Sequence, residues 1–400
     1  MALIFPFKAI LFHASQDADI TPLVAPPYDV ISAADQVTYR DRNEHNVVRL
    51  ILPEGARYAQ AGTLFGEWLS SGVLAEDEQP SMYVWEQQFE QAGESVTRRA
   101  LVCQVACGPY QEGGVLRHEH THAGPKADRL ALYQATGAQF SQIFGVFRDA
   151  GDGVAQILAK ASEGPLLRQA AAADGHHSRL YRISGAETLA HLQSALAECS
   201  IVMADGHHRY ETMGNYFEAA GAAGTALMTL VPDRDPGVTV LPTHRVAELP
   251  LAPAELAKGL SSGYDLETHP AGRWPDLHRG QLAAAGAELL AVSLAHDTAL
   301  RLLPTVGGAQ LAATGTVGLL HDDCLPRLNA AAPQKFAYYH VAAEAVEATA
   351  SRGQWAFLLP PVSVDRLIAA VEGGAVFPPK STYFFPKFLS GFINARIAPR

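Results

Sequence analysis

The segment Ile201-Val202-Met203-Ala204-Asp205-Gly206-His207-His208-Arg209 joins an apolar run to a polar turn that contains a glycine. The first four residues predict a buried strand, and residues 210–220 have the spacing of a helix. A strand that passes through a tight turn into a helix is typical of α/β proteins, which usually bind ligands at the carboxyl ends of strands. We therefore expect a strand, a turn at residues 205–209 and a helix, with ligand chemistry at the turn.

The turn has the residue types of an anion site. Gly206 lets a ligand approach the backbone, and the N–H groups and positive end of the following helix favour an anion. Asp205 can accept a proton or bind a metal, whereas His207 and His208 can titrate near neutral pH. Arg209 can bind phosphate through two hydrogen bonds, and we expect it at a solvent-accessible turn. The structural alternative is that Asp205 caps the helix and Arg209 forms an ordinary salt bridge.

A second polar cluster runs from Arg117 to His122 and has histidine at every other position. If the segment is extended, its three histidines lie on one face, and His-x-His spacing can chelate a metal. The residues that follow, Gly124-Pro125-Lys126 and Asp128-Arg129, are more typical of an anion-contacting loop that leads into a helix. Phosphate or substrate contact is therefore favoured over a structural zinc, and a solvated polar loop is the third interpretation.

Two turns that begin with proline present further polar side chains, Pro27-Tyr28-Asp29 and Pro379-Lys380-Ser381-Thr382. Each has a structural alternative, since Asp29 can cap an approaching helix and Lys380 can be a surface lysine. We expect Asp29, His118 and the 205–209 turn to converge on one cleft. We also expect Lys380-Ser381-Thr382 to reach that cleft from the second half of the chain.

The 400 residues are 48% hydrophobic and 18% charged, which predicts about two globular domains. Prolines and lost periodicity near residue 250 predict the boundary, so that the domains cover residues 1–250 and 251–400. Strands and helices alternate in both, which predicts an α/β protein with a mixed (α+β) sheet. The expected strands are 3–10, 81–88, 95–105, 143–148, 201–204, 226–231, 238–241 and 355–359, and the expected helices are 59–70, 128–136, 186–197, 210–220, 342–351 and 364–372.

Composition and missing motifs disfavour several classes of protein. The net charge of −11 disfavours a nucleic-acid partner. Neither a secretory signal nor an apolar stretch of about 20 residues is present, so we expect a cytoplasmic protein without a membrane partner. The motifs of P-loop kinases, Rossmann oxidoreductases, α/β-hydrolases and zincins are absent from the sequence.

Six segments together carry a family resemblance. They are Phe5-Pro6-Phe7-Lys8-Ala9, Ala25-Pro26-Pro27-Tyr28-Asp29-Val30, His118-Glu119-His120-Thr121 with Asp128-Arg129, Ala204 to Thr212, Leu241-Pro242-Thr243-His244-Arg245 and Pro379 to Lys387. On these segments the chain resembles, over essentially its whole length, domain-of-unknown-function family 1015, whose members are also called SerK-like. The resemblance implies a ParB/sulfiredoxin-like N-terminal portion, with a second α/β portion packed against it.

The resemblance also implies an activity, because related proteins are free-serine kinases with a similar Asp-Gly-His-His-Arg segment at the phosphate site. It implies transfer of a phosphoryl group from ATP, ADP or polyphosphate to L-serine, giving O-phosphoserine. Such a reaction mainly needs positioned reactants and neutralised charge. Mg²⁺ is expected to bind mainly through the phosphates. Asp205 or Asp29 would orient or deprotonate the acceptor hydroxyl.

The candidate residues fall into two groups. The catalytic candidates are Asp29, Asp205, His207, His208 and Arg209, and the candidates for substrate or phosphate binding are Tyr28, His118, Glu119, His120, Thr121, Lys126, Arg129, Gly206, Glu211, Lys380, Ser381 and Thr382.

Two other functions stay open at this point. One is a metal-dependent hydrolase of a phosphate ester, with metal ligands from His118, His120, Asp205 and His207. The other is a nucleotide-binding regulator without turnover, since the ParB-like fold also serves as a nucleotide-dependent switch. The acidic net charge argues against a DNA-binding form of such a regulator.

Overall fold

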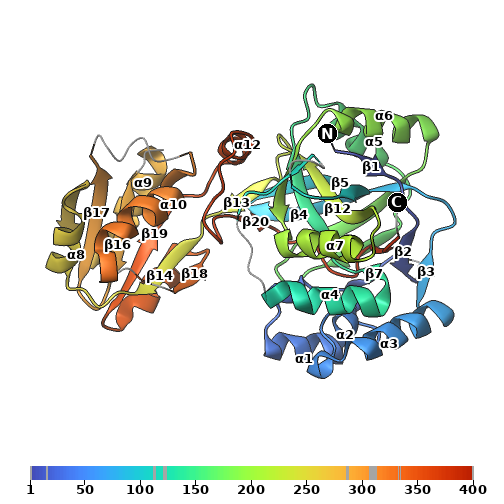
Figure 1. Ribbon diagram of the computed structural model, residues 1–400, viewed down its shortest axis with the longest axis horizontal. Helices are drawn as coiled ribbons and strands as arrows, with labels where there is room; N and C mark the ends of the chain where they lie inside the picture. The colour runs from blue at the N-terminus through green and yellow to red at the C-terminus, as the bar shows by residue number, and fades with distance from the viewer. Residues whose placement is uncertain are drawn as a thin grey trace. The chain divides into compact units, whose positions relative to one another are not determined.

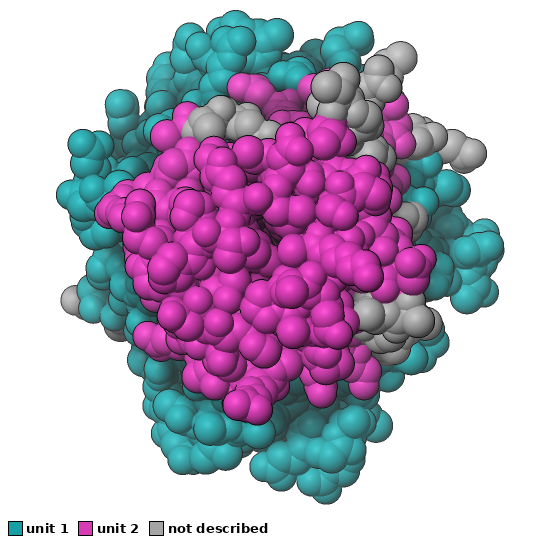
Figure 2. Space-filling model, turned by 90° about the vertical axis from the view of Figure 1, so that its left-hand side faces the viewer, with its two compact units in different colours: residues 1–117, 121–239, 386–400 teal, residues 118–120, 240–385 magenta. Residues whose placement is uncertain are grey.

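The computed structural model describes residues 2–14, 17–110, 114–119, 124–284, 288–305, 313–331, 333 and 335–398. Contacts divide the chain into two compact units (Figure 2). Unit 1 contains residues 1–117, 121–239 and 386–400, and unit 2 contains residues 118–120 and 240–385. Residues 386–400 thus group with the first unit, whereas the sequence prediction placed them in the second portion.

A mixed sheet forms the centre of unit 1, and nine of the described strands belong to it. Its order is β6-β11-β8-β12-β5-β4-β10-β9, with β1 paired to β5. The pairs β11–β6 and β12–β8 are parallel, and the other pairs are antiparallel. The bounds are β1 (Ile4–Phe5), β4 (Met82–Gln91), β5 (Glu94–Cys107), β6 (Val115–Leu116), β8 (Ile143–Phe147), β9 (Arg168–Ala171), β10 (His177–Ile183), β11 (Ile201–Asp205) and β12 (Gly224–Pro232).

Turn chemistry fixes the longest hairpin of this sheet. Strands β4 and β5 are joined by Ala92 and Gly93, which have φ values of 52° and 83°. Two consecutive residues with positive φ are typical of a two-residue hairpin turn whose twist matches the strands. The register that follows places Gln87 opposite Arg98.

Helices cover one face of the unit 1 sheet. In Figure 1, α7 lies over the sheet, α4 lies beside α7 and α3 beside α4. Leu158, Leu192 and Met213, from α5, α6 and α7, share one buried core with the sheet. The bounds are α1 (Ala33–Arg42), α2 (Val48–Ile51), α3 (Tyr58–Ser70), α4 (Gly124–Thr136), α5 (Gly153–Ala161), α6 (Ala186–Ala197) and α7 (His207–Ala219).

The last residues of the chain contact the side chain of Trp85 on β4. The rings of Phe388 and Phe392 have their centroids 4.9 and 4.4 Å from that of Trp85. The C-terminal segment then forms β21, which belongs to a smaller sheet of order β3-β2-β21-β7. Its strands are β2 (Ala9–Phe12), β3 (Leu74–Glu76), β7 (Ala138–Gln139) and β21 (Asn394–Arg396).

Unit 2 contains a six-stranded antiparallel sheet of order β15-β17-β16-β19-β14-β18. Its strands are β14 (His244–Glu248), β15 (Tyr264–His269), β16 (Leu289–Ser293), β17 (Thr298–Pro304), β18 (Phe336–Tyr339) and β19 (Gln354–Leu358), and a two-stranded ribbon adds β13 (Thr239–Leu241) and β20 (Tyr383–Phe385). The helices are α8 (Pro253–Leu260), α9 (Trp274–Ala284), α10 (Gly315–Gly318), α11 (Ala342–Glu347) and α12 (Val364–Glu372). Ala345 and Val346 of α11 pack with Val292 and Ala356 of the sheet in one core.

The mixed α/β class predicted from the sequence is confirmed. Periodicity located α6 and α12 at their observed bounds. The structure adds α1, whose N-cap residue Ser32 accepts a hydrogen bond from the backbone N–H of Asp35. In the described part of the chain, no helix is both long and apolar enough to cross a membrane.

Candidate functional site

The predicted strand, turn and helix are present around Gly206. Strand β11 ends at Asp205, and α7 begins at His207, three residues before the start predicted from periodicity. Gly206 is the N-cap residue, with φ 91° and ψ 26°, a conformation that favours glycine. No side-chain hydrogen bond caps α7 at Gly206, and the N-terminal end of a helix favours an anion.

Asp205 lies between two cations. Its Oδ2 accepts a hydrogen bond from Nη2 of Arg209 at 3.1 Å, and its Oδ1 is 3.3 Å from Nζ of Lys387. Burial alone raises the pKa of Asp205, but Lys387, Arg209 and His207 outweigh burial and hold the pKa well below its usual value. Asp205 is therefore a weak proton acceptor at neutral pH.

Arg209 is 5% exposed, so the expectation of a solvent-accessible turn is wrong. Its Nη1 donates to the main-chain carbonyl of Gln142, which precedes β8, and its Nη2 donates to Asp205. Burial lowers the pKa of Arg209, but Asp205, Asp29 and Tyr28 raise it above its usual value. The guanidinium is thus a permanently charged group whose orientation is fixed by two acceptors, the carboxylate of Asp205 at the end of β11 and the carbonyl of Gln142 just before β8.

The Pro27-Tyr28-Asp29 turn lies near this guanidinium. Tyr28 and Asp29 begin a short 3-10 helix at Tyr28–Val30, and both interact electrostatically with Arg209. Asp29 is exposed to solvent, whereas Tyr28 is half-buried. Burial raises the pKa of Tyr28, with a further increase from Asp29. Asp29 therefore lies within electrostatic range of Arg209.

The side chain of Arg129 packs against the ring of Tyr28. Its guanidinium carbon lies 4.0 Å from the centroid of the Tyr28 ring, and its Nη2 donates to the carbonyl of Ile51 at 2.9 Å. Its Nε donates to Asp128 at 2.8 Å, and Tyr58 donates to the same carboxylate. Arg129 is 2% exposed, so these contacts make it a support for the turn.

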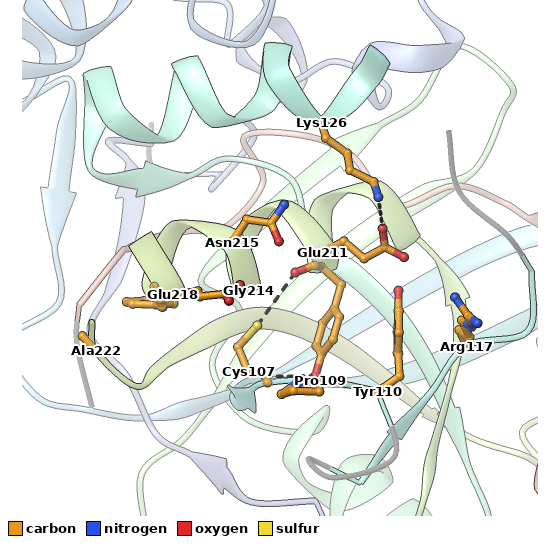
Figure 3. A pocket seen from close by; sticks show the side chains of 13 residues that line it. Cys107, Pro109, Tyr110, Arg117, Lys126, Glu211, Gly214, Asn215, Glu218 and Ala222 are labelled. Atoms are coloured by element: carbon orange, nitrogen blue, oxygen red, sulfur yellow. Dashed lines mark hydrogen bonds and ion pairs between the residues drawn. The ribbon is translucent and has the colours of Figure 1, made fainter. Parts of the chain in front are cut away.

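A pocket of about 710 Å³ lies beside the same helix (Figure 3). Lys126 of α4 and Glu211 of α7, which both line the pocket, form an ion pair. The ring of Tyr110 stacks on that of Tyr210, with centroids 5.3 Å apart, and the guanidinium of Arg117 lies 5.7 Å from the Tyr110 centroid; all three residues line the pocket. The volume fits a small molecule, and charges of both signs line the pocket.

In unit 2 the predicted polar residues form a second cluster. Nε2 of His118 and Oγ1 of Thr382 are 2.8 Å apart, and the N–H of Lys380 donates to Oε2 of Glu119 at 2.9 Å. Nη2 of the fully buried Arg245 donates to the carbonyl of Lys380 at 3.1 Å. Lys380 has φ 59°, which is strained for a residue with a side chain. Its backbone is therefore held on both sides.

The candidate residues are divided between the units. In unit 1 lie Tyr28, Asp29, Lys126, Arg129, Asp205, Gly206, His207, His208, Arg209 and Glu211, in unit 2 lie His118, Glu119, Lys380, Ser381 and Thr382, and His120 and Thr121 lie outside the described residues. His207 is buried and His208 half-buried in the first turn of α7. That the two sets meet in one cleft stays a prediction.

Lys387 is the residue that sequence reasoning missed. It ends the Pro379–Lys387 segment, in which only Lys380, Ser381 and Thr382 were selected. The single available signal was its charge after an apolar run. Among the described residues, no group of three or more His, Cys, Asp or Glu side chains is placed to hold a metal ion.

A family model described as a protein of unknown function (DUF1015) matches residues 4–352, and no curated protein matches the chain. Among solved structures, a free serine kinase variant in complex with ADP is 13% identical with a TM-score of 0.41, over 75% of this chain and 91% of that one. A conserved hypothetical protein from Pyrococcus furiosus is 12% identical with a TM-score of 0.37, over 75% of this chain and 94% of that one. C-terminally truncated SbnI from Staphylococcus aureus is 11% identical with a TM-score of 0.38, over 72% and 85% of the two chains. Likenesses this distant do not assign an activity.

Proposed function

The chain belongs to the DUF1015 family, and we propose that it is a phosphotransferase that converts free L-serine to O-phosphoserine with ATP, ADP or polyphosphate as donor. Unit 1, with a ParB/sulfiredoxin-like fold, carries the reaction. One observation supports the proposal most directly: the glycine-capped N-terminus of α7 has Arg209 and Lys387 beside it. Helix N–H groups together with an arginine and a lysine are a combination that binds phosphate.

The proposed roles follow from these positions. The first N–H groups of α7 bind the oxygens of the transferring phosphoryl group, and Arg209 and Lys387 neutralise the charge that develops on it. His207 and His208, in the first turn of the helix, donate to the same oxygens. Arg209 cannot lose its charge, so its contribution does not depend on pH near neutrality.

Asp29 is the better of the two candidates for the general base. Both oxygens of Asp205 already contact cations, and its pKa is depressed. Asp29 is exposed and can meet the acceptor hydroxyl. In the proposed step, the serine oxygen attacks the terminal phosphorus while the bond from phosphorus to the bridging oxygen of the donor breaks. The hydroxyl proton passes to Asp29, and the shortened donor leaves with the bond electrons.

Magnesium that accompanies such donors is coordinated mainly by phosphate oxygens and water. Asp205 makes a poor ligand for it, because two cations occupy its oxygens. We therefore assign no residue of the chain to the metal. The same pairing disfavours the metal-dependent hydrolase, which needs Asp205 as a ligand.

Phosphorus NMR tests the proposal. The purified protein is incubated with L-serine, Mg²⁺ and, in turn, ATP, ADP and polyphosphate, and a phosphoserine signal is the expected result. Arg209→Met should abolish the signal, whereas Arg57→Gln should leave it unchanged, because Arg57 forms an exposed ion pair with Glu54. Donor binding without any product would support a nucleotide-binding regulator, and absence of product with every donor would refute the kinase.

A further inference from the structure

Arg98 is a charged side chain with no exposed surface, in the middle of β5. Burial lowers the pKa of its guanidinium to about 9, although Asp235 raises it. A buried cation destabilises a fold unless its contacts offset the loss of water. The contacts of Arg98 therefore indicate what its burial achieves.

The guanidinium donates in two directions. Its Nε donates to Oε1 of Gln87 at 3.1 Å, and its Nη2 donates to the main-chain carbonyl of Pro386 at 2.5 Å. Gln87 is the cross-strand partner of Arg98 on β4 and is also fully buried. Because arginine can only donate, the amide oxygen of Gln87 must face it. The amide nitrogen then faces away and donates to the carbonyl of Lys387 at 3.2 Å.

Two consecutive carbonyls of the C-terminal segment are thus bound by one cross-strand pair. The next residue, Phe388, is fixed as well, since the Arg98 guanidinium lies 4.6 Å from its ring centroid and the Phe144 ring lies 5.1 Å from it. The backbone of Lys387 is held between these contacts. Its side chain is 16% exposed and reaches Oδ1 of Asp205 at 3.3 Å.

We propose that Arg98 and Gln87 are positioning residues that hold the backbone at Pro386 and Lys387, so that the Lys387 ammonium stays at Asp205 and contacts the phosphate of the donor. The phosphate contact rests on the proposed function, whereas the positioning does not. Lysine has a long, flexible stem and loses much rotamer entropy when its ammonium is fixed. Anchoring the backbone on both sides of its Cα limits the positions that the ammonium can reach.

A double-mutant cycle tests the proposal on the full chain, with Arg98→Met, Lys387→Met and the double variant. Affinity for pyrophosphate is measured by calorimetry, and the carboxyl titration of Asp205 is followed by carbon NMR. Each single change should weaken pyrophosphate binding about tenfold and move the titration of Asp205 upward. The double variant should be no weaker than Lys387→Met, because Arg98 acts through Lys387.

Arg99→Met is the matched control. Arg99 is the next residue on β5, so its side chain leaves the opposite face of the strand, where it pairs with Glu86 at 3.0 Å. This variant should keep both the affinity and the titration. If Arg98→Met does not fold, Gln87→Glu replaces it, because a carboxylate stays paired with Arg98 but cannot donate to the carbonyl of Lys387. Additive losses in the cycle, or an Asp205 titration that neither anchor variant moves, would overturn the positioning.

The outcomes also separate this proposal from the proposed kinase. If the wild type makes no phosphoserine but the Arg98 and Lys387 variants shift the Asp205 titration as expected, the kinase is refuted and the positioning is supported. A wild-type protein that makes phosphoserine while Lys387→Met keeps its pyrophosphate affinity supports the kinase and overturns the phosphate contact of Lys387.

Discussion

Replacing Gly206 by alanine tests whether the orientation of Arg209 matters, because the chain contains a matched control. A Cβ added at Gly206, where φ is +91°, lies 3.0 Å from Nη2 of Arg209. Gly175 has φ +88°, and a Cβ added there meets no atom of the described residues within 4 Å. Both glycines follow an aspartate and precede two histidines. The two substitutions therefore share the backbone strain and differ in the contact with Arg209.

The difference in stability can be worked out from these contacts. Strain at positive φ costs about 1–3 kcal/mol in either variant. In Gly206→Ala the guanidinium must also shift, which weakens its hydrogen bonds to Gln142 and Asp205. Hydrogen bonds to charged groups contribute about 1.5–3 kcal/mol each. A partial loss of both corresponds to about 1–2 kcal/mol, or a Tm roughly 2–8 °C below that of Gly175→Ala.

Thermal unfolding without ligand gives the two Tm values, and calorimetry gives the affinity for pyrophosphate. We expect Gly175→Ala to bind as the wild type does and Gly206→Ala to bind at least about tenfold more weakly, a difference of about 1.4 kcal/mol. Equal Tm values and equal affinities in the two variants would refute the role given to the Arg209 guanidinium.

Three further predictions concern single residues. Arg209→Lys should lower the free energy of unfolding by about 1.5–3 kcal/mol, because one ammonium cannot reproduce the planar guanidinium that bonds to two acceptors. It should also lower turnover roughly 100- to 1000-fold. Unchanged turnover with the best donor would contradict this prediction. Burial lowers the pKa of His244 to about 3, below the unfolded value of about 6.5, so its contribution to stability is complete above about pH 6.5 and is lost as the pH falls. The free energy of unfolding, measured with urea, should fall between pH 7 and pH 5 by about 2 kcal/mol more in the wild type than in His244→Gln. Equal decreases in the two proteins would count against this prediction. Lys380→Gly should raise the free energy of unfolding by about 0.5–1 kcal/mol by relieving the backbone strain at φ 59°, and Ala92→Gly, at φ 52°, should do the same. Only Lys380→Gly should weaken pyrophosphate binding. Equal binding by the two variants would leave Lys380 a surface lysine.

Local signals in the sequence predicted part of the elements, but the expected strand 3–10 is two strands, β1 and β2, that belong to different sheets. The strand-turn-helix at Gly206 needed nothing more than an apolar run, a glycine and helical spacing. The environment of Arg209 could not be predicted in this way. Its burial depends on the carbonyl of Gln142, 67 residues earlier, and no pattern within the segment encodes that contact. Lys387 was missed for the same reason, because its neighbour Asp205 is distant in sequence and its anchors lie on β4 and β5. Charge and spacing thus selected candidate residues, whereas the tertiary contacts of each candidate had to come from the structure.

The position of β21 affects how unit 1 can fold during synthesis. This strand pairs with β2 on one edge and β7 on the other, yet the ribosome makes it after the roughly 150 residues of unit 2. About 255 residues are made between the end of β7 at Gln139 and the start of β21 at Asn394. At about 5–20 residues per second, the edge of β7 waits about 13–50 s for its partner, and the edge of β2, made earlier, waits longer. Unpaired edges of this kind invite pairing with other chains, so the nascent protein is most exposed to aggregation in that interval. Since Lys387 arrives with the same segment, the ion pair between Lys387 and Asp205, and with it the proposed anion site, can form only after translation has passed unit 2.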